Sequence, residues 1–219
     1  MAQTTKPEVP QLARVIAGAT PPLAAEDQHL ALALYRHLAR GEPVATVALA
    51  AAMERDAAEV EATLARWPGV YRGDDDRILA FWGLALPEMA HGFRLDERQL
   101  YTWCAWDALF IPGLIGETAE VESRSPVSGE RVRLRVAPER VLEVEPRGMV
   151  VSMLAPRKRF DYQVVTSFCH FVHFLSSSAD AEGWLVEHPE TFLLTVDEAF
   201  ELGRLTNRAK FGEALDNAT

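Results

Sequence analysis

Two cysteines and one aspartate are the residues of this chain whose types and spacing point to chemistry. Cys104 and Asp107 are three positions apart in a stretch dense in apolar and aromatic residues, LDERQLYTWCAWDALFIPGLI at 95–115. On a helix, that spacing places a thiol and a carboxyl on one face. Cys169 follows 65 positions later, within SFCHFVHF. Thiolates and carboxylates bind metals and move protons, so these residue types could form a reactive site if the fold brings them together.

The residues around the first thiol and the carboxyl predict the element that positions them. Apolar residues are so dense at 95–115 that a helix made from them would be covered by protein on nearly every side. Asp96 with Gln99 three residues on resembles a capping box at its start, and Pro112 and Gly113 break the pattern at its end. We therefore expect the thiol and the carboxyl in the middle of a rigid helix.

The second cysteine lies in a run of aromatic and β-branched residues that predicts a strand. Period-two alternation places Cys169 on one face of that strand, together with Phe171 and His173. If this face meets the predicted helix, Cys169 converges with Cys104 and Asp107.

The residue pattern alone leaves other interpretations open. On spacing alone, both cysteines are more typical of small buried hydrophobic residues, and Asp107 of a hydrogen-bonded polar group within a helix. With His173 as a fourth ligand, Cys104, Asp107 and Cys169 would also form a Zn or Cu site in a non-catalytic metal-binding protein. The paired C-x₂-C or H-x₃-H spacing that usually accompanies tetrahedral zinc is absent from the sequence.

Composition narrows the class of protein. The 219 residues are 48% hydrophobic and 25% charged, which is typical of a globular chain with a substantial core. The formal net charge of −10 argues against nucleic acid or an anionic membrane as a main partner. No apolar run has the length of a membrane span, and the first residues do not resemble a secretory signal, so we expect a cytoplasmic protein. In that compartment the two cysteines stay thiols.

The first third of the chain predicts a small helical domain. Residues 1–22 hold little core material and predict a flexible N-terminal arm, with a helical turn around 12–16. Leucines at spacing four then predict a helix that ends near Gly41, and two alanine-rich helices at 44–53 and 56–67 follow as in a helix-turn-helix. Two short strands around 73–76 lie where a winged helix carries its wing. We therefore expect a winged-helix-like domain at 23–82.

A winged helix is most often a DNA reader, which makes a metal-responsive transcriptional regulator a competing hypothesis. Residues 1–80 contain 8 basic and 11 acidic residues, however, and the wing tip carries three consecutive aspartates. The predicted recognition helix has Arg66 as its one cation among several acidic residues. Phosphate contacts require cations, so we predict a packing domain that does not bind DNA.

The remainder of the chain predicts a sheet with flanking helices. TAEVESR, ERVRLRV, VLEVEP and GMVVSML alternate or run apolar, and short turns separate them. A helix at 179–188, a strand at 192–196 and a helix at 197–210 complete the chain. Short connections permit hairpins but not parallel crossovers, so we expect an α+β domain with a mostly antiparallel sheet at 83–219.

Five segments also carry a family resemblance: RQLYTWCAWDALFIPGLIG, SGERVRL, EPRGMVVSML, SFCHFVHFLSS and VDEAFELGRLTNR. They are similar to segments of the bacterial organomercurial lyases, also called alkylmercury lyases, and the similarity runs in order from about Leu23 to near Arg208. The resemblance implies a winged-helix-like domain followed by a catalytic domain. It also implies an enzyme of mercury detoxification that cleaves the carbon–mercury bond of alkyl- and arylmercury compounds by protonolysis, giving a hydrocarbon and Hg(II).

The family's YxWCxxD and SFC motifs fall on Cys104, Asp107 and Cys169, which the resemblance implies as catalytic residues and as ligands of the Hg(II) product. Hg(II) is a soft cation that prefers thiolates, so two cysteines can hold it as the organic group leaves while a carboxyl group moves protons. Desolvation in a water-poor pocket is expected to raise the pKa of Asp107.

Around that pocket we expect aromatic walls from Trp103, Trp106 and Phe168. The resemblance implies an organomercurial as substrate and no organic cofactor. Low-molecular-weight thiols are expected to be needed for turnover, with mercuric reductase as a candidate recipient of Hg(II).

Overall fold

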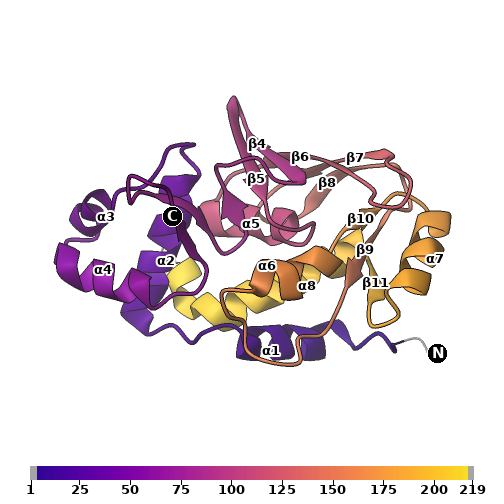
Figure 1. Cartoon of the computed structure of the whole chain (residues 1–219), viewed down its shortest axis with the longest axis horizontal. Helices are drawn as coiled ribbons and strands as arrows, with labels where there is room; N and C mark the ends of the chain where they lie inside the picture. The colour runs from indigo at the N-terminus through magenta and orange to yellow at the C-terminus, as the bar shows by residue number, and fades with distance from the viewer. Residues whose placement is uncertain (1–3, 217–219) are drawn as a thin grey trace.

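A computed structural model describes residues 4–216 as a mixed assembly of helices and antiparallel strands (Figure 1). The helices are α1 (Val9–Ala19), α2 (Ala25–Leu38), α3 (Thr46–Ala52), α4 (Ala57–Ala65), α5 (Asp107–Ile115), α6 (Val164–Ser167), α7 (Ser178–Glu187) and α8 (Val196–Phe211), with short 3-10 helices η1 (Cys169–Phe171) and η2 (Gly212–Leu215). The strands are β1 (Val70–Arg72), β2 (Ile78–Phe81), β3 (Leu84–Ala85), β4 (His91–Leu95), β5 (Arg98–Thr102), β6 (Ala119–Arg124), β7 (Arg131–Val136), β8 (Val141–Glu145), β9 (Val150–Met153), β10 (Phe174–Leu175) and β11 (Phe192–Thr195).

The larger of the two described sheets has eight strands in the order β1-β2-β3-β5-β4-β6-β7-β8, and the smaller has the order β10-β9-β11. Every described strand pair is antiparallel, which confirms the expected sheet type. Buried and exposed residues alternate strictly along β6 and β7, because one face of these strands lies on the core.

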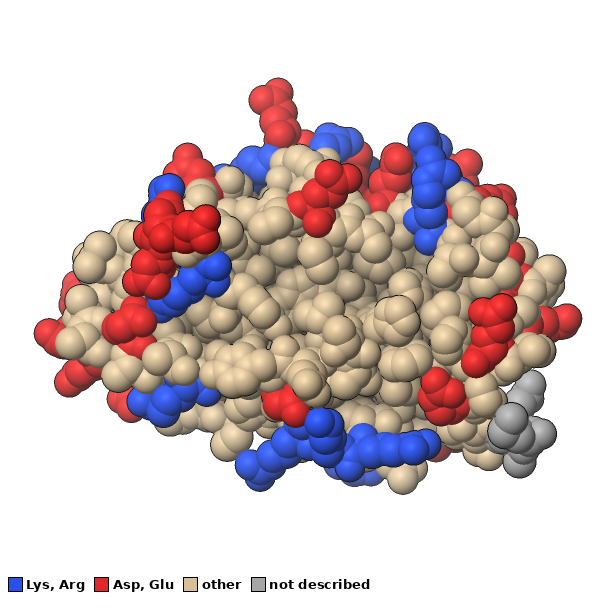
Figure 2. Space-filling model, in the orientation of Figure 1, with Lys and Arg blue, Asp and Glu red and all other residues tan. Residues whose placement is uncertain are grey.

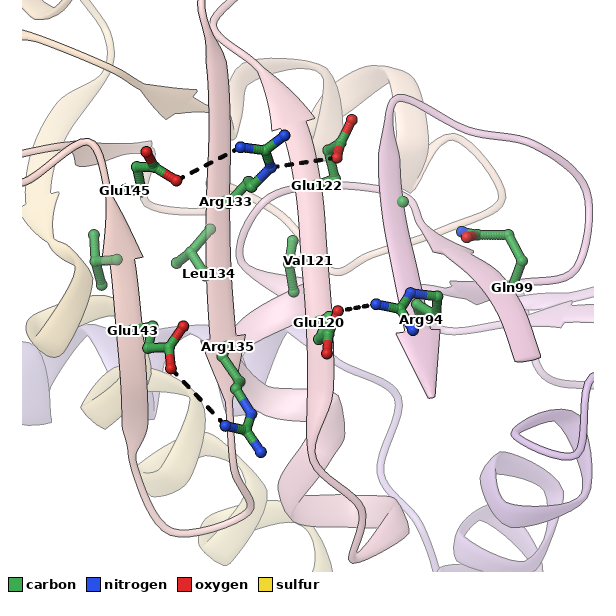
Figure 3. Close-up of a pocket in the computed structure, with 12 residues that line it drawn as sticks. Arg94, Gln99, Glu120, Val121, Glu122, Arg133, Leu134, Arg135, Glu143 and Glu145 are labelled. Atoms are coloured by element: carbon green, nitrogen blue, oxygen red, sulfur yellow. Dashed lines mark hydrogen bonds and ion pairs between the residues drawn. The ribbon is translucent and has the colours of Figure 1, made fainter. Parts of the chain in front are cut away.

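Charged side chains line the opposite, outward face of β4, β6, β7 and β8 (Figure 3). Arg133 pairs with Glu122 and Glu145 at 3.6 Å each, and Arg135 pairs with Glu143 at 3.9 Å. They line a shallow groove of about 610 Å³. Its charges largely neutralise one another and it contains no thiol, so this groove is a solvated sheet face rather than the site of the expected chemistry.

The N-terminal third has the helices and the hairpin that the sequence predicts. The leucines at spacing four lie buried on α2, α3 and α4 come next, and Asp56 caps α4 by accepting a hydrogen bond from the backbone N–H of Ala58 at 2.8 Å. The β1-β2 hairpin is continuous with the rest of the large sheet, because β2 pairs with β3, which pairs with β5. These strands therefore belong to the eight-stranded sheet.

The expected loose arm is wrong for residues 9–19. They form α1, whose side chains Leu12, Ala13 and Ile16 are buried, and the helix packs against α8 along the lower side of Figure 1. Leu12 and Ile16 are four positions apart and so share one helical face, which is enough apolar surface to dock a helix of 11 residues.

The helix expected across 95–115 is also wrong in its first half. Residues 91–102 form the β4-β5 hairpin, in which Leu95 pairs with Arg98 across a two-residue turn. Asp96 has φ +50° in that turn instead of capping a helix. The helix begins only at Asp107 and continues through Pro112 to Ile115, where Gly116 ends it with φ +75°.

Helix α5 lies inside the molecule, between the large sheet and α8 (Figure 1). It contacts β6 and β7 on one side and α2 and α8 on others, which agrees with the prediction of an element covered on nearly every side. Gly203 of α8 permits α8 and α5 to pack closely, because a Cβ there would come within 2.5 Å of the Cβ of Phe110 on α5. The first turn of α5 is therefore held in a fixed position.

The surface reflects the acidic composition. Figure 2 shows acidic side chains spread around the visible face and basic side chains in a few separate groups. Among the described helices, none combines the length with the apolar character that crossing a bilayer requires.

Candidate active site

The first cysteine lies in the turn that joins β5 to α5, and the aspartate is the first residue of α5. The predicted mid-helix placement of Cys104 and Asp107 is therefore wrong, although the two side chains do lie together. The backbone N–H of Cys104 donates to Oδ2 of Asp107 at 2.9 Å, and the hydroxyl of Thr102 donates to the Cys104 carbonyl at 3.0 Å. The turn is thus fixed by its own hydrogen bonds.

The second cysteine is not on a strand. Cys169 opens the 3-10 helix η1, so the shared strand face with Phe171 and His173 does not exist. A long-range backbone hydrogen bond joins the two cysteine segments: the backbone N–H of Ala105 donates to the carbonyl of Val172 at 3.1 Å. This bond ties the turn before α5 to the end of η1.

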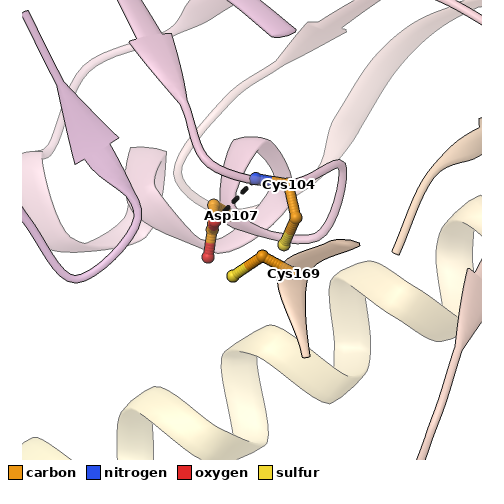
Figure 4. Close-up of side chains that lie close together, drawn as sticks. All are labelled: Cys104, Asp107 and Cys169. Carbon is orange, nitrogen blue, oxygen red and sulfur yellow. Dashed lines mark hydrogen bonds between the residues drawn. The ribbon is translucent and has the colours of Figure 1, made fainter. Parts of the chain in front are cut away.

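The three candidate residues come together despite these local differences (Figure 4). The Sγ atoms of Cys104 and Cys169 and a carboxylate oxygen of Asp107 all lie within 4.8 Å of one another. All three are buried, with exposed fractions of 0%, 5% and 6%. Within residues 4–216 no other group of three or more such ligands is formed, and His173 does not join this one. Its Nε2 lies 2.8 Å from the carbonyl of His170, so the four-ligand Zn or Cu arrangement is not present.

A glycine makes room for the carboxyl group. Trp82 and Gly83 form the tight turn between β2 and β3, with φ +32° and +100°. A Cβ at Gly83 would lie 2.5 Å from Cγ and 2.6 Å from Oδ1 of Asp107, closer than any real contact of that kind. Only glycine fits both the backbone conformation and the space at this position.

Burial shapes the acid–base properties of the trio. It raises the pKa of Asp107 to about 7, against the opposing effect of the hydrogen bonds from Cys104. Burial, the hydrogen bond with Cys169 and the charge of Asp107 also raise the pKa of Cys104 well above its usual value. The hydrogen bond from Cys104 acts to lower the pKa of Cys169, but burial and the Asp107 charge outweigh it, so this pKa rises too. Near neutral pH the resting site therefore holds two thiols and an acid that is partly protonated.

A small cavity of about 50 Å³ opens onto two of the three residues. Asp107 and Cys169 line it, whereas the fully buried Cys104 does not. The expected aromatic residues Trp103, Trp106 and Phe168 are all among its walls. A space of this volume holds only one or two waters, so reacting groups at Cys169 are largely shielded from solvent.

Sequence reasoning missed several residues that complete the cavity. Trp82, Gly83 and Phe160 lie on its walls, and so does Lys210 near the end of α8. The tryptophan–glycine pair in the segment FWGLAL was a usable signal, since glycine after a bulky residue marks a tight turn. Nothing local in the sequence marks Phe160 or Lys210, because each reaches the cavity through tertiary packing.

Comparisons with known proteins bear on the family of the chain and on its fold. Residues 84–207 match the family model described as MerB, alkylmercury lyase. The chain is similar to the alkylmercury lyase of Staphylococcus epidermidis, 42% identical over 78% of each chain. It is equally similar to that of Pseudomonas putida, 42% identical over 80% of this chain and 82% of the other. Its fold resembles the crystal structure of the mercury-bound form of MerB2, with a TM-score of 0.72 at 21% identity, over 93% of this chain and 99% of that one.

Proposed function

The chain belongs to the alkylmercury lyase family, and we propose that it cleaves the carbon–mercury bond of alkyl- and arylmercury compounds by protonolysis. The products are a hydrocarbon and Hg(II), and the role is mercury detoxification. One observation carries the proposal: two thiols and a carboxyl group lie within 4.8 Å of one another beside a small, largely apolar cavity. Soft sulfur ligands suit mercury, and a carboxyl group with a pKa of about 7 suits proton transfer at neutral pH.

The steps balance without a redox change. An organomercury cation meets Cys169 first, because this thiol lines the cavity, and an Hg–S bond forms as the thiol loses its proton to the medium. Cys104 then binds the same mercury atom and passes its proton to Asp107, whose carboxyl lies beside it. Asp107 delivers that proton to the carbon as the carbon–mercury bond breaks, and both electrons of the bond leave with the hydrocarbon. Hg(II) remains bound by two thiolates.

We propose further features of the reaction and of its setting. The reaction requires no organic cofactor, and external low-molecular-weight thiols remove Hg(II) for the next turnover, with mercuric reductase as a recipient. The setting is cytoplasmic, where thiols stay reduced. Residues 23–82 serve as a winged-helix-like packing domain, which their excess of acidic residues supports.

Replacement of Asp107 by asparagine tests the proton step. The amide oxygen of Asp107→Asn can still accept the hydrogen bond from the Cys104 N–H, so the turn should persist. An amide cannot deliver a proton at neutral pH, and general acid catalysis typically contributes about 10²–10⁴-fold in rate. After exposure to methylmercury, mass spectrometry should show protein carrying an intact CH₃Hg group, with methane release reduced by that factor.

A purely structural role for the carboxyl group predicts another outcome. In that case Asp107→Asn would change thermal stability while methane appeared at close to the wild-type rate. Such a result would assign proton delivery to a different group. Capture of mercury by the wild-type chain with no hydrocarbon released would instead favour a metal-binding protein.

A further inference from the structure

One cation lies in the cavity, and the chemistry proposed above does not use it. Lys210 lines the same space as Asp107 and Cys169, and it is the only lysine or arginine among the residues that do so. Its Nζ lies 4.7 Å from the ring centroid of Trp82 and 5.6 Å from that of Phe211. Within residues 4–216, no carboxylate lies within 4.0 Å of this ammonium group, whereas the other two lysines of the chain are both ion-paired.

The surroundings of this ammonium are unusual for a lysine. The side chain is only partly exposed, and burial lowers the pKa of Lys210 to about 8. Contacts with aromatic faces are attractive but provide no counter-charge. Burying a cation without a nearby anion costs free energy. Ionisable groups in cavities whose pKa is shifted in this way are frequently functional. The position of Lys210 is therefore explained best by an anion that enters the cavity.

The proposed reaction identifies the anion by its chemistry. Once Hg(II) is held by Cys104 and Cys169, its removal requires two new sulfur ligands. Each exchange forms one Hg–S bond to an incoming thiolate and breaks one Hg–S bond to a cysteine, which takes up the proton that the incoming thiol lost. No electron is transferred, and Hg(II) leaves as a dithiolate. The cavity of about 50 Å³ admits the sulfur end of a small thiol but not a bulky charged tail.

We propose that Lys210 holds the sulfur anion of a low-molecular-weight thiol at the cavity, in position to attack mercury bound to Cys169 and Cys104. This inference rests on the proposed function, because it assigns a residue to the release of the Hg(II) product. Lys210 acts as a thiolate-binding residue. The row of rings formed by Trp82, Phe160 and Phe168, with neighbouring centroids 6.2 and 5.0 Å apart, leads from the ammonium towards the cysteine segment.

The test bypasses carbon–mercury cleavage. Wild-type protein and Lys210→Met are loaded with one equivalent of inorganic Hg(II), and its release is followed as 2-mercaptoethanol is titrated in. Loss of one ion pair of about 1.4 kcal/mol corresponds to tenfold in binding, so the thiol concentration that gives half-maximal release should rise about tenfold. Lys210→Arg should restore release, because it keeps a cation at this place. Lys6→Met, which removes an exposed lysine paired with Glu198 at the other end of α8, should match wild type.

Three results would overturn the inference. The first is half-maximal release of Hg(II) from Lys210→Met at the same thiol concentration as from wild type. The second is failure of Lys210→Arg to restore release. The third is slower or weaker release from Lys210→Met with mercaptoacetate as the thiol but not with 2-mercaptoethanol. The last would mean that Lys210 binds a carboxylate rather than the sulfur. Lys210→Gln, which keeps a polar side chain, replaces the methionine variant if that one unfolds. Hydrocarbon release by the wild type is measured separately, so failure of the lyase proposal is distinguishable from failure of this one.

Discussion

Substitution of Gly83 by alanine should reduce catalysis by displacing the carboxyl group of Asp107. The new Cβ would lie 2.5 Å from Cγ of Asp107, and ordinary contact begins near 3.4 Å, so the carboxyl must retreat by roughly 1 Å. Misplacement of that size can cost about 10²-fold in rate. The positive φ of +100° and the forced contact should also lower the free energy of unfolding by about 2–4 kcal/mol.

The assay measures hydrocarbon release in a single turnover together with denaturant unfolding. Gly116→Ala is the matched control, because Gly116 also has a positive φ, of +75°, but a Cβ added there would meet nothing within 4 Å. The control should lose about 1–2 kcal/mol of stability while keeping its rate. A folded Gly83→Ala protein that released hydrocarbon at the same rate as Gly116→Ala would refute the reasoning.

The site and the N-terminal segment lead to three further predictions. The pKa of Asp107 is raised from 3.8 to about 7 in the folded protein, so between these pH values the folded state holds a proton that the unfolded state has lost. The contribution of Asp107 to the free energy of unfolding should therefore fall by about 4 kcal/mol as the pH rises from 4 to 7. Denaturant unfolding of wild type and Asp107→Asn at pH 5 and pH 8 checks this prediction. The variant should lack the decrease in stability that titration of Asp107 causes. Cys169→Ser should abolish turnover, because an alcohol is a hard and far less acidic ligand, and near-normal hydrocarbon release with excess thiol would contradict two-thiolate binding. Gel shifts at low salt should show no complex of the chain with duplex DNA, and a tight, sequence-selective shift would revive the regulator hypothesis.

Local patterns predicted most of the regular elements. Period-two alternation indicated β6 and β7, and leucines at spacing four indicated α2, because in these segments one face is buried and the other is solvated. The stretch at 95–115 misled because it is apolar on nearly every side. In the structure HGFRL is a strand with alternating burial and Asp96 lies in a hairpin turn, whereas the density of aromatic residues had favoured a helix.

The composition of the candidate site was predictable, and its geometry was not. Cys104, Asp107 and Cys169 stood out by type and motif, yet neither cysteine lies on the expected element. The backbone hydrogen bond from Ala105 to Val172 sets their approach, and a backbone contact between segments so far apart leaves no mark on local residue patterns. The same holds for Lys210, which reaches the cavity only through the packing of α8 against α5.

The backbone hydrogen bond from Ala105 to Val172 also affects the affinity with which the two thiols bind one mercury atom. In an unfolded chain, bridging Cys104 and Cys169 would close a loop of 65 residues, at an entropic cost of about 4 kcal/mol. In the folded chain the loop is already closed before any metal arrives. The difference corresponds to roughly 10³-fold in the effective concentration of the second thiol. The folded structure therefore raises the affinity for Hg(II) by holding the two thiols together. A bound Hg(II) ion should in turn stabilise the folded state against unfolding.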